Sequence, residues 1–240
     1  MKKLAFILLS AAMVLTLAAC TGTGQQAPAL PSSPSSQAGS SSTPGAEDGT
    51  SQSGGAATGG NILIAYFSVP ETDGVDTVAG ASRVVVDGEV LGNNQYLAQL
   101  IQQETGGDLF RIETVQEYPG SHDALLNFAY NERSDDARPE LATQIQNPDN
   151  YDVIFLGYPN WNSDLPMPLY TFLEEYDFSG KTIIPFTAHG GSGFSRTIRT
   201  IQELQPNATV IDDGLSISRN RVADAQDDVI SWISGLNIAP

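Results

Sequence analysis

The chain has 240 residues, a formal net charge of −17 at pH 7, one cysteine and two histidines. This excess of acidic residues disfavours nucleic acid as a partner and also disfavours direct docking on anionic lipid. One cysteine excludes an intramolecular disulfide, and one cysteine with two histidines leaves too few ligands for a typical zinc site.

The N-terminus has the pattern of a secretory signal. Lys2 and Lys3 precede an apolar run over residues 4–17, which is shorter than the roughly 20 residues of a membrane-spanning helix. The run ends with the letters LAAC at Cys20, a motif that resembles the bacterial lipobox. That resemblance implies a signal peptide over residues 1–19, cleavage before Cys20 and attachment of lipid to Cys20. The alternative is an uncleaved membrane anchor.

Residues 20–60 are predicted to form a flexible, lipid-anchored linker. Apart from Leu30, Glu47 and Asp48, the residues after Cys20 are all Gly, Ser, Thr, Ala, Gln or Pro. Such a composition cannot bury enough apolar surface to offset the entropy of ordering. We therefore expect one globular domain over residues 61–240, attached to a membrane only through the lipid. The expected location is the outer face of the bacterial cytoplasmic membrane.

Within this domain, β-rich runs alternate with helical patterns. Apolar and β-branched runs predict strands at 62–68, 109–115, 153–158 and 182–187, and a broken fifth strand at 208–211 and 215–217. Apolar residues at helical spacing predict helices at 93–105, 121–134, 169–176, 194–204 and 222–235. This alternation indicates an α/β fold with a five-stranded parallel sheet, helices on both faces and the strand order 2-1-3-4-5.

One segment interrupts the pattern between the first strand and the first helix. Within residues 69–92, Asp87 and Gly88 separate two β-rich arms, which predicts a β-hairpin. This hairpin insert is expected at the mouth of the ligand site, either as a surface decoration or as a lid or partner contact.

Ligands of open α/β sheets bind at the carboxyl ends of the strands, here strands 1, 3 and 4. Ser68 ends the first strand, and Gly92, Asn93, Asn94 and Gln95 open the first helix. The free N–H groups of a helix start favour a phosphate without any basic side chain. The alternative is an ordinary cap, in which one of the two asparagines satisfies the first turn.

The loops after the third and fourth strands suit a flat aromatic ligand, and we favour a flavin. Pro159 and Asn160 precede Trp161, whose ring would either stack on the ligand or cover the edge of the core. The next loop contains three glycines in four residues, which permit close approach of the backbone to a ring. Its candidate residues are Thr187, His189, Gly190, Gly191 and Gly193.

His189 has two interpretations. Its imidazole would orient a substrate or stabilise negative charge on a reduced flavin, or it would only form a local hydrogen bond within the loop. The sequence indicates no residue with a firm catalytic role.

Six stretches carry a resemblance to the flavodoxin-like proteins of bacteria, closest to a subgroup of exported lipoproteins. They are ILIAYFS, GNNQYLAQLI, YNERSDDARPEL, YDVIFLGYPNW, PMPLYTFLEEYDFSGKTIIPF and HGGSGFS. The resemblance spans residues 62–236 and implies a flavodoxin-like three-layer sandwich with non-covalent FMN. It also implies that Ser68 and residues 92–95 hold the phosphate, while residues 159–161 and 187–193 contact the isoalloxazine. The chain departs from the family pattern in the phosphate loop. The insert splits this loop, and Asn94 replaces the usual threonine.

Three functions fit this sequence. The leading hypothesis is a membrane-tethered FMN protein that transfers electrons with a redox partner protein or a small donor or acceptor. The second is an FMN-dependent NAD(P)H or quinone oxidoreductase, in which the polar His189 side chain would assist the reaction. The third is a flavin-free binding module, which the altered phosphate loop suggests.

Overall fold

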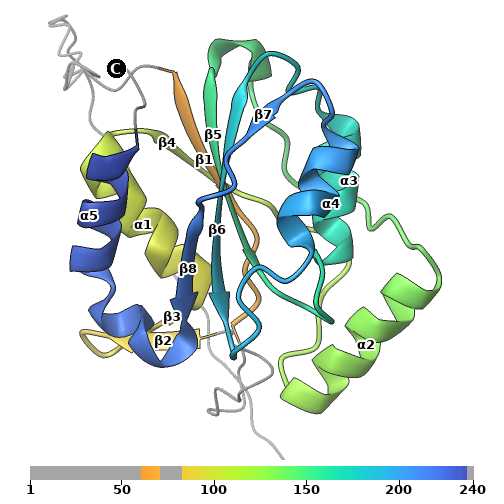
Figure 1. Ribbon diagram of the computed structural model, residues 1–240. Coiled ribbons are helices and arrows are strands. Elements are labelled where there is room, and N and C mark those ends of the chain that lie inside the picture. Colours follow the sequence, from red (N-terminus) through yellow and green to blue (C-terminus); the bar gives the residue numbers. More distant parts are fainter. Residues whose placement is uncertain (1–60, 71–82, 237–240) are drawn as a thin grey trace, which may run out of the picture. The chain divides into compact units, whose positions relative to one another are not determined.

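The computed structural model describes residues 61–70 and 83–236 (Figure 1). The expected signal peptide, the lipidation site at Cys20, the linker up to residue 60 and residues 71–82 of the insert lie outside these described residues. Within the described residues, no helix combines the length and the apolar character needed to cross a membrane.

The main sheet has the predicted order. The elements are β1 (Ile62–Tyr66), β2 (Arg83–Val86), β3 (Glu89–Gly92), α1 (Asn93–Thr105), β4 (Asp108–Arg111), α2 (His122–Ser134), η1 (Pro148–Asn150), β5 (Val153–Pro159), α3 (Met167–Glu175), β6 (Thr182–His189), α4 (Thr197–Leu204), β7 (Thr209–Val210), β8 (Leu215–Ser218), η2 (Arg219–Asp224) and α5 (Gln226–Gly235). Strands β4, β1, β5 and β6 lie side by side in that order, and β7 and β8 both pair with β6. All these pairs are parallel, so the predicted α/β fold and strand order are confirmed.

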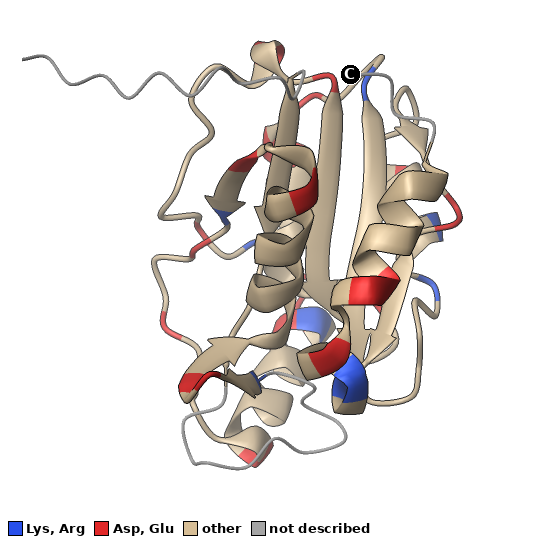
Figure 2. Cartoon of the chain, turned by 90° about the vertical axis from the view of Figure 1, so that its left-hand side faces the viewer, with Lys and Arg blue, Asp and Glu red and all other residues tan. Residues whose placement is uncertain are grey.

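Helices cover both faces of the sheet, which gives three layers (Figure 1). Along β1, Leu63 and Ala65 pack in the same core cluster as Leu169 of α3, whereas Ile64 packs with Leu97 of α1 on the other face. This alternation follows from the two-residue period of a strand. The central strands β1, β5 and β6 contain no Asp, Glu, Lys or Arg, as expected for strands buried on both faces (Figure 2).

The fifth strand is broken, as predicted. β7 pairs with Thr182 and Ile183 of β6, and β8 pairs with residues 186–189. Pro185 lies at the break, and proline has no N–H to donate to a neighbouring strand. Gly214 passes so close to this point that a Cβ atom there would lie 2.4 Å from the Pro185 carbonyl oxygen.

The hairpin insert is also confirmed. β2 and β3 pair antiparallel, with Arg83 opposite Gly92, and Asp87 and Gly88 form the turn with φ angles of 51° and 85°. Positive φ at both central residues is what a tight hairpin turn requires. Because β3 ends at Gly92 and α1 begins at the next residue, the hairpin leads directly into the predicted phosphate site.

Three predicted boundaries were wrong by three residues or more. The strand predicted over 109–115 ends at Arg111, after which the chain leaves the sheet. The helix predicted over 194–204 begins at Thr197, since Ser195 has a φ of 51°, which no α-helix contains. The helix predicted over 222–235 divides into η2 and α5, and α5 begins where Asp227 and Asp228 stabilise a helix start.

Candidate functional site

The two parts of the split phosphate loop meet in space. The insert leaves the sheet after Ser68 and returns at Gly92, and a Cβ atom built on Gly92 would lie 2.0 Å from Ser68 Oγ. Any residue other than glycine would therefore displace the serine. Both residues are buried. The contact brings together two positions that the insert separates in the sequence.

Helix α1 starts without a side-chain cap. Its N-cap is Gly92, whose N–H donates to Gln95 Oε1 at 3.2 Å, and no side chain caps the helix. The alternative in which Asn93 or Asn94 caps the helix is therefore wrong. The remaining N–H groups of the first turn have no partner within the helix, so they are available to an acceptor outside it.

Asn93 is the most unusual residue at this helix start. Its side chain is fully buried, and within the part of the chain that the structure describes neither Nδ2 nor Oδ1 has a hydrogen-bond partner. A buried polar group without a partner costs about 1–3 kcal/mol. An amide held in this state beside free backbone N–H groups suits a ligand with strong acceptor oxygens.

Two other predicted residues join the strand ends to one another. Asn94 Oδ1 accepts a hydrogen bond from the Ala188 N–H at 2.9 Å, which links the start of α1 to the end of β6. Thr187 is fully buried, and its Oγ1 donates to the Tyr158 carbonyl at 2.7 Å. The Thr187 side chain thus ties β6 to β5.

The loops after β5 and β6 are joined by Asn160. Its Nδ2 donates to the Gly193 carbonyl at 2.7 Å, while its buried Oδ1 has no partner. Pro159, one residue earlier, is buried and pairs with Ala188 of β6. The backbone of the second loop has φ angles of 138° at Gly191 and 58° at Gly193, so glycine is favoured at both positions.

Gly190 and His189 are partly buried. His189 Nδ1 accepts a hydrogen bond from the Gly191 N–H at 3.0 Å, so the neutral imidazole carries its proton on Nε2. Burial lowers the His189 pKa below its ordinary 6.5. At neutral pH the side chain is uncharged and forms the local hydrogen bond that was one of its two predicted interpretations.

The Trp161 ring lies in an aromatic cluster and is 4% exposed. It meets Phe67 edge to face, with ring centroids 5.5 Å apart at 81°, and lies 5.5 Å from Tyr118 at 54°. In this arrangement the ring covers the edge of the core. Stacking of Trp161 on a flavin stays a prediction.

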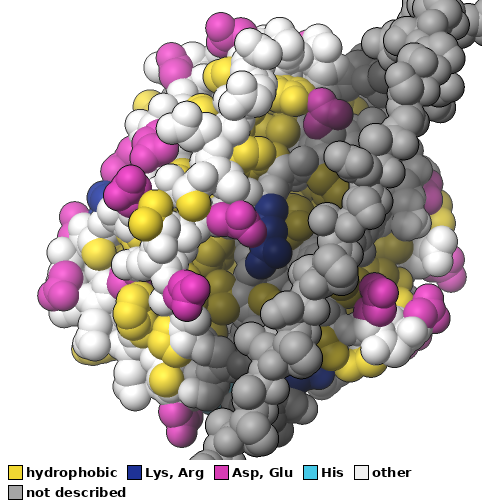
Figure 3. Space-filling model, turned by 180° about the vertical axis from the view of Figure 1, so that it is seen from behind, with side chains coloured by type: hydrophobic (Ala, Val, Ile, Leu, Met, Phe, Trp, Pro, Cys, Tyr) yellow, Lys and Arg dark blue, Asp and Glu magenta, His cyan; other side chains and the backbone are white. Residues whose placement is uncertain are grey.

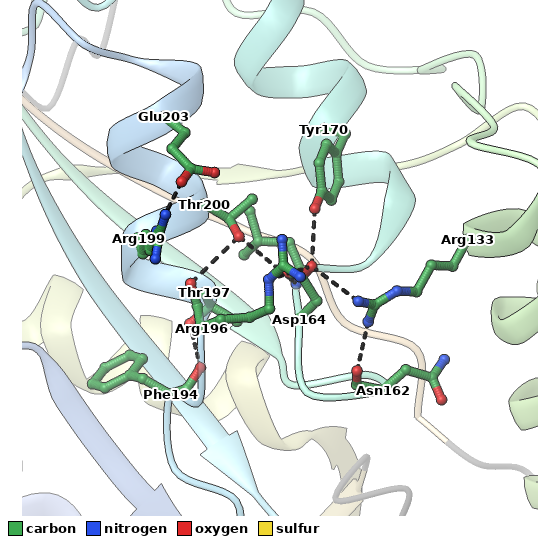
Figure 4. Close-up of polar contacts among 11 residues, drawn as sticks. Arg133, Asn162, Asp164, Tyr170, Phe194, Arg196, Thr197, Arg199, Thr200 and Glu203 are labelled. Atoms are coloured by element: carbon green, nitrogen blue, oxygen red, sulfur yellow. Dashed lines mark hydrogen bonds and ion pairs between the residues drawn. The ribbon is translucent and has the colours of Figure 1, made fainter.

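One charged group in this region was not predicted from the sequence, the buried carboxylate of Asp164. It follows the Trp161 loop and binds Arg133, Tyr170, Arg196 and Thr200 (Figure 4). A single acid between Ser163 and a run of apolar residues was the available signal. Its significance depends on partners that are distant in the sequence.

Acidic side chains dominate the charge of the molecule, with 28 Asp and Glu against 11 Lys and Arg. On the face shown in Figure 3, acidic side chains are scattered among apolar ones and few basic side chains are visible. Few basic side chains are therefore available to bind an anion.

The comparisons with known proteins agree with this fold. The sequence model of the flavodoxin family matches residues 83–236, more than half of the chain, so the chain belongs to the flavodoxin family. No curated protein matches it.

Solved structures of flavoproteins resemble the chain. The crystal structure of a candidate flavoprotein from Bacteroides uniformis ATCC 8492 is 26% identical, covers 73% of this chain and 99% of its own, and superimposes with a TM-score of 0.50. A second candidate flavoprotein, from Bacteroides eggerthii DSM 20697, is 24% identical. The match covers 71% of this chain and 98% of that protein, with a TM-score of 0.47. A flavoprotein in complex with FMN from Lactobacillus acidophilus NCFM is 18% identical. The match covers 70% of this chain and 99% of that protein, with a TM-score of 0.48.

Proposed function

We propose that this chain binds FMN non-covalently and transfers electrons through it. The observation that carries the proposal is the fully buried Asn93 amide, which has no hydrogen-bond partner among the described residues and lies at a helix start whose N-cap is a glycine. Membership of the flavodoxin family supports the same cofactor. When bound, FMN would supply one- and two-electron redox chemistry that no side chain of this protein has.

The phosphate would be held by Ser68, Asn93 and the N–H groups of residues 93–95. The Ser68 hydroxyl and the Asn93 amide can donate hydrogen bonds, and the helix dipole favours negative charge at this end. Gly92 allows the serine to lie against the helix start, because a Cβ atom would occupy that space. The residues present therefore fit a phosphate monoester.

The ring would be held by the loops after β5 and β6. Asn160 already joins these loops through Gly193, and its unpaired Oδ1 is an acceptor that suits a ring N–H. Gly191 and Gly193 allow the backbone to approach a flat ligand closely. Trp161 would contribute an aromatic wall.

The domain would be tethered outside the cell. The LAAC motif at Cys20 and the composition of residues 20–60 support a lipid anchor followed by a flexible linker. This arrangement would place the cofactor at the outer face of the cytoplasmic membrane, where it would exchange electrons with a redox partner protein or a small donor or acceptor.

A titration with two flavins tests the proposal. FMN should bind at least about tenfold more tightly than riboflavin, which lacks the phosphate, because charged hydrogen bonds contribute about 1.5–3 kcal/mol each. Gly92→Ala should remove this preference, since its Cβ atom would displace Ser68. Gly235→Ala is the matched control, because no atom lies within 4 Å of a Cβ there. Dissociation constants follow from flavin fluorescence.

Equal affinity of the wild-type protein for both flavins would contradict the phosphate site. A colourless protein that ignores added FMN would favour a flavin-free binding module.

One observation favours the oxidoreductase as a second candidate. A cavity of about 420 Å³ opens at the carboxyl ends of β1 and β4, and its walls include Phe67, Ser68, Arg111 and Tyr118. Because Ser68 belongs to the proposed phosphate site and Phe67 contacts Trp161, a small acceptor in this cavity would lie beside the cofactor site. Steady oxidation of NAD(P)H with a quinone would support the enzyme, and exchange only with a protein partner would support the carrier.

A further inference from the structure

The loop after β5 contains a tight turn that carries two of the proposed ring contacts. Trp161 and Asp164 exchange two backbone hydrogen bonds of 3.1 and 2.9 Å, and the two residues between them, Asn162 and Ser163, have φ angles of 53° and 63°. Left-handed conformations cost free energy in residues other than glycine. Interactions elsewhere must therefore hold this turn in place.

The Asp164 carboxylate supplies these interactions. Within the turn segment, its Oδ1 accepts a hydrogen bond from the Leu165 N–H at 2.9 Å. Thr200 of α4 donates to the same oxygen at 2.8 Å, and Tyr170 of α3 donates to Oδ2 at 3.1 Å. Three elements of the fold thus converge on one carboxyl group (Figure 4).

Two arginines neutralise the buried charge. The Asp164 side chain is 3% exposed, and its Oδ2 lies 3.4 Å from Arg133 Nη2 and 3.1 Å from Arg196 Nε. Arg133 also donates to the Asn162 carbonyl at 2.5 Å, so α2 is hydrogen-bonded to the turn at a second point. A buried carboxylate is stable only when it is paired and fully hydrogen-bonded. Asp164 satisfies both conditions through residues from α2, α3 and the start of α4.

These contacts fix the spacing of the two loops around the proposed ring site. The loops are joined at one point by Asn160 and Gly193. They are joined at a second point by Asp164 and Arg196, which follows the glycine-rich loop. Two attachments between the same loops restrict both their separation and their relative rotation.

We propose that Asp164 is the positioning residue of the flavin-ring site: through Arg133 and Arg196 it holds the turn that presents Asn160 and Trp161. The inference rests on the proposed function. Asp164 would not touch the reacting atoms, and its effect would be transmitted by the geometry of the turn.

Asp164→Asn tests the proposal because it keeps the size of the side chain and removes its charge. In the variant, an amide nitrogen can occupy the place of Oδ2, where it would face the donors of Arg133 and Arg196. We expect FMN affinity to fall by about tenfold or more, since displacements near 1 Å in a site have effects of this size. Glu203→Gln, which removes an exposed ion pair with Arg199 on the same helix α4, should leave the affinity unchanged.

Trp161 fluorescence gives a second readout that needs no flavin. The chain contains two tryptophans, so Trp232→Phe leaves Trp161 as the sole emitter. In this background, Asp164→Asn should shift the emission to longer wavelength and increase quenching by acrylamide. If Asp164→Asn fails to fold, Arg133→Gln and Arg196→Gln combined remove the same ion pairs from side chains that are 35% and 56% exposed.

The outcomes separate the two proposals. Unchanged emission and unchanged FMN affinity would overturn the positioning role, as would a lower melting temperature with unchanged affinity. A wild-type protein that binds no FMN would overturn the proposed function and, with it, this inference. Weaker FMN binding and altered Trp161 emission in the Asp164 variant, but not in the Glu203 control, would support both the proposed function and the positioning role.

Discussion

Glu132 is a buried carboxylate. Among the described residues, no arginine or lysine forms an ion pair with it. It is 8% exposed, and it accepts hydrogen bonds from Gln116 and from the Tyr118 hydroxyl, which lies 2.9 Å from both carboxylate oxygens. Burial raises the Glu132 pKa above its ordinary 4.5, because these neutral donors only partly replace water. Tyr118 in turn contacts Trp161, so this acid lies behind the aromatic cluster.

The raised pKa predicts a pH-dependent contribution to stability. Because the folded state binds the Glu132 proton more tightly than the unfolded state, the contribution is fully present below about pH 4.5 and is lost as pH rises through the folded pKa. Glu132→Gln should remove this dependence, so the variant should gain stability relative to the wild type between pH 4 and pH 7. Urea unfolding across this range measures the difference. A difference that is constant with pH would contradict the raised pKa.

The hairpin insert has one face in the core and one face in solvent. Val84 is 8% exposed and packs in the cluster that contains Leu97 of α1, whereas the neighbouring Val85 is 54% exposed. Val85 lies opposite Val90, which is 50% exposed, so the outer face is also apolar. The inner face attaches the hairpin to the domain and thereby fixes Gly92 at the start of α1.

Two neighbouring valines give a matched test of this attachment. Val84→Ala should lower the free energy of unfolding by about 1–2 kcal/mol, because it removes buried apolar surface. Val85→Ala should change it by less than about 0.5 kcal/mol, as surface substitutions usually do. Chemical denaturation measures both. Equal effects would mean that the hairpin is not part of the cooperative core.

The charge of the whole molecule should affect the redox potential of a bound flavin. A net charge of −17 disfavours any added electron, so we expect the midpoint potential to lie below that of free FMN. Because the Debye length shrinks from about 30 Å at 0.01 M salt to about 10 Å at 0.1 M, added salt should reduce this difference. Redox titrations of the protein and of free FMN at several KCl concentrations measure it. A potential equal to that of free FMN at low salt would contradict the prediction.

Local sequence was sufficient for the strands, the helices and the hairpin turn, because their signals lie within a few residues. The apolar runs of β1, β5 and β6 are buried on both faces, and Asp87-Gly88 adopts positive φ angles through its own chemistry. Even the break in the fifth strand was visible as a gap between two β-rich runs. The order of the strands followed from the alternation of elements and the handedness of their connections.

The details of the site depend on contacts between distant residues. Only the folded chain brings Ser68 against Gly92, which is the N-cap of α1. The direction of the Trp161 ring is likewise set by Phe67 and Tyr118, since a loop side chain points toward whatever it packs against.

Asp164 is the clearest case of a site residue whose contacts cannot be predicted from its neighbours in the sequence. Its neighbours in the sequence identify a short loop, and nothing more. Its two arginines come from α2 and from the residue before α4, which only the tertiary structure brings together. Periodicity along a chain encodes which face of an element is buried, because burial follows the element's own geometry. The partners of a buried charge are encoded nowhere locally, because they are fixed only when separate elements pack.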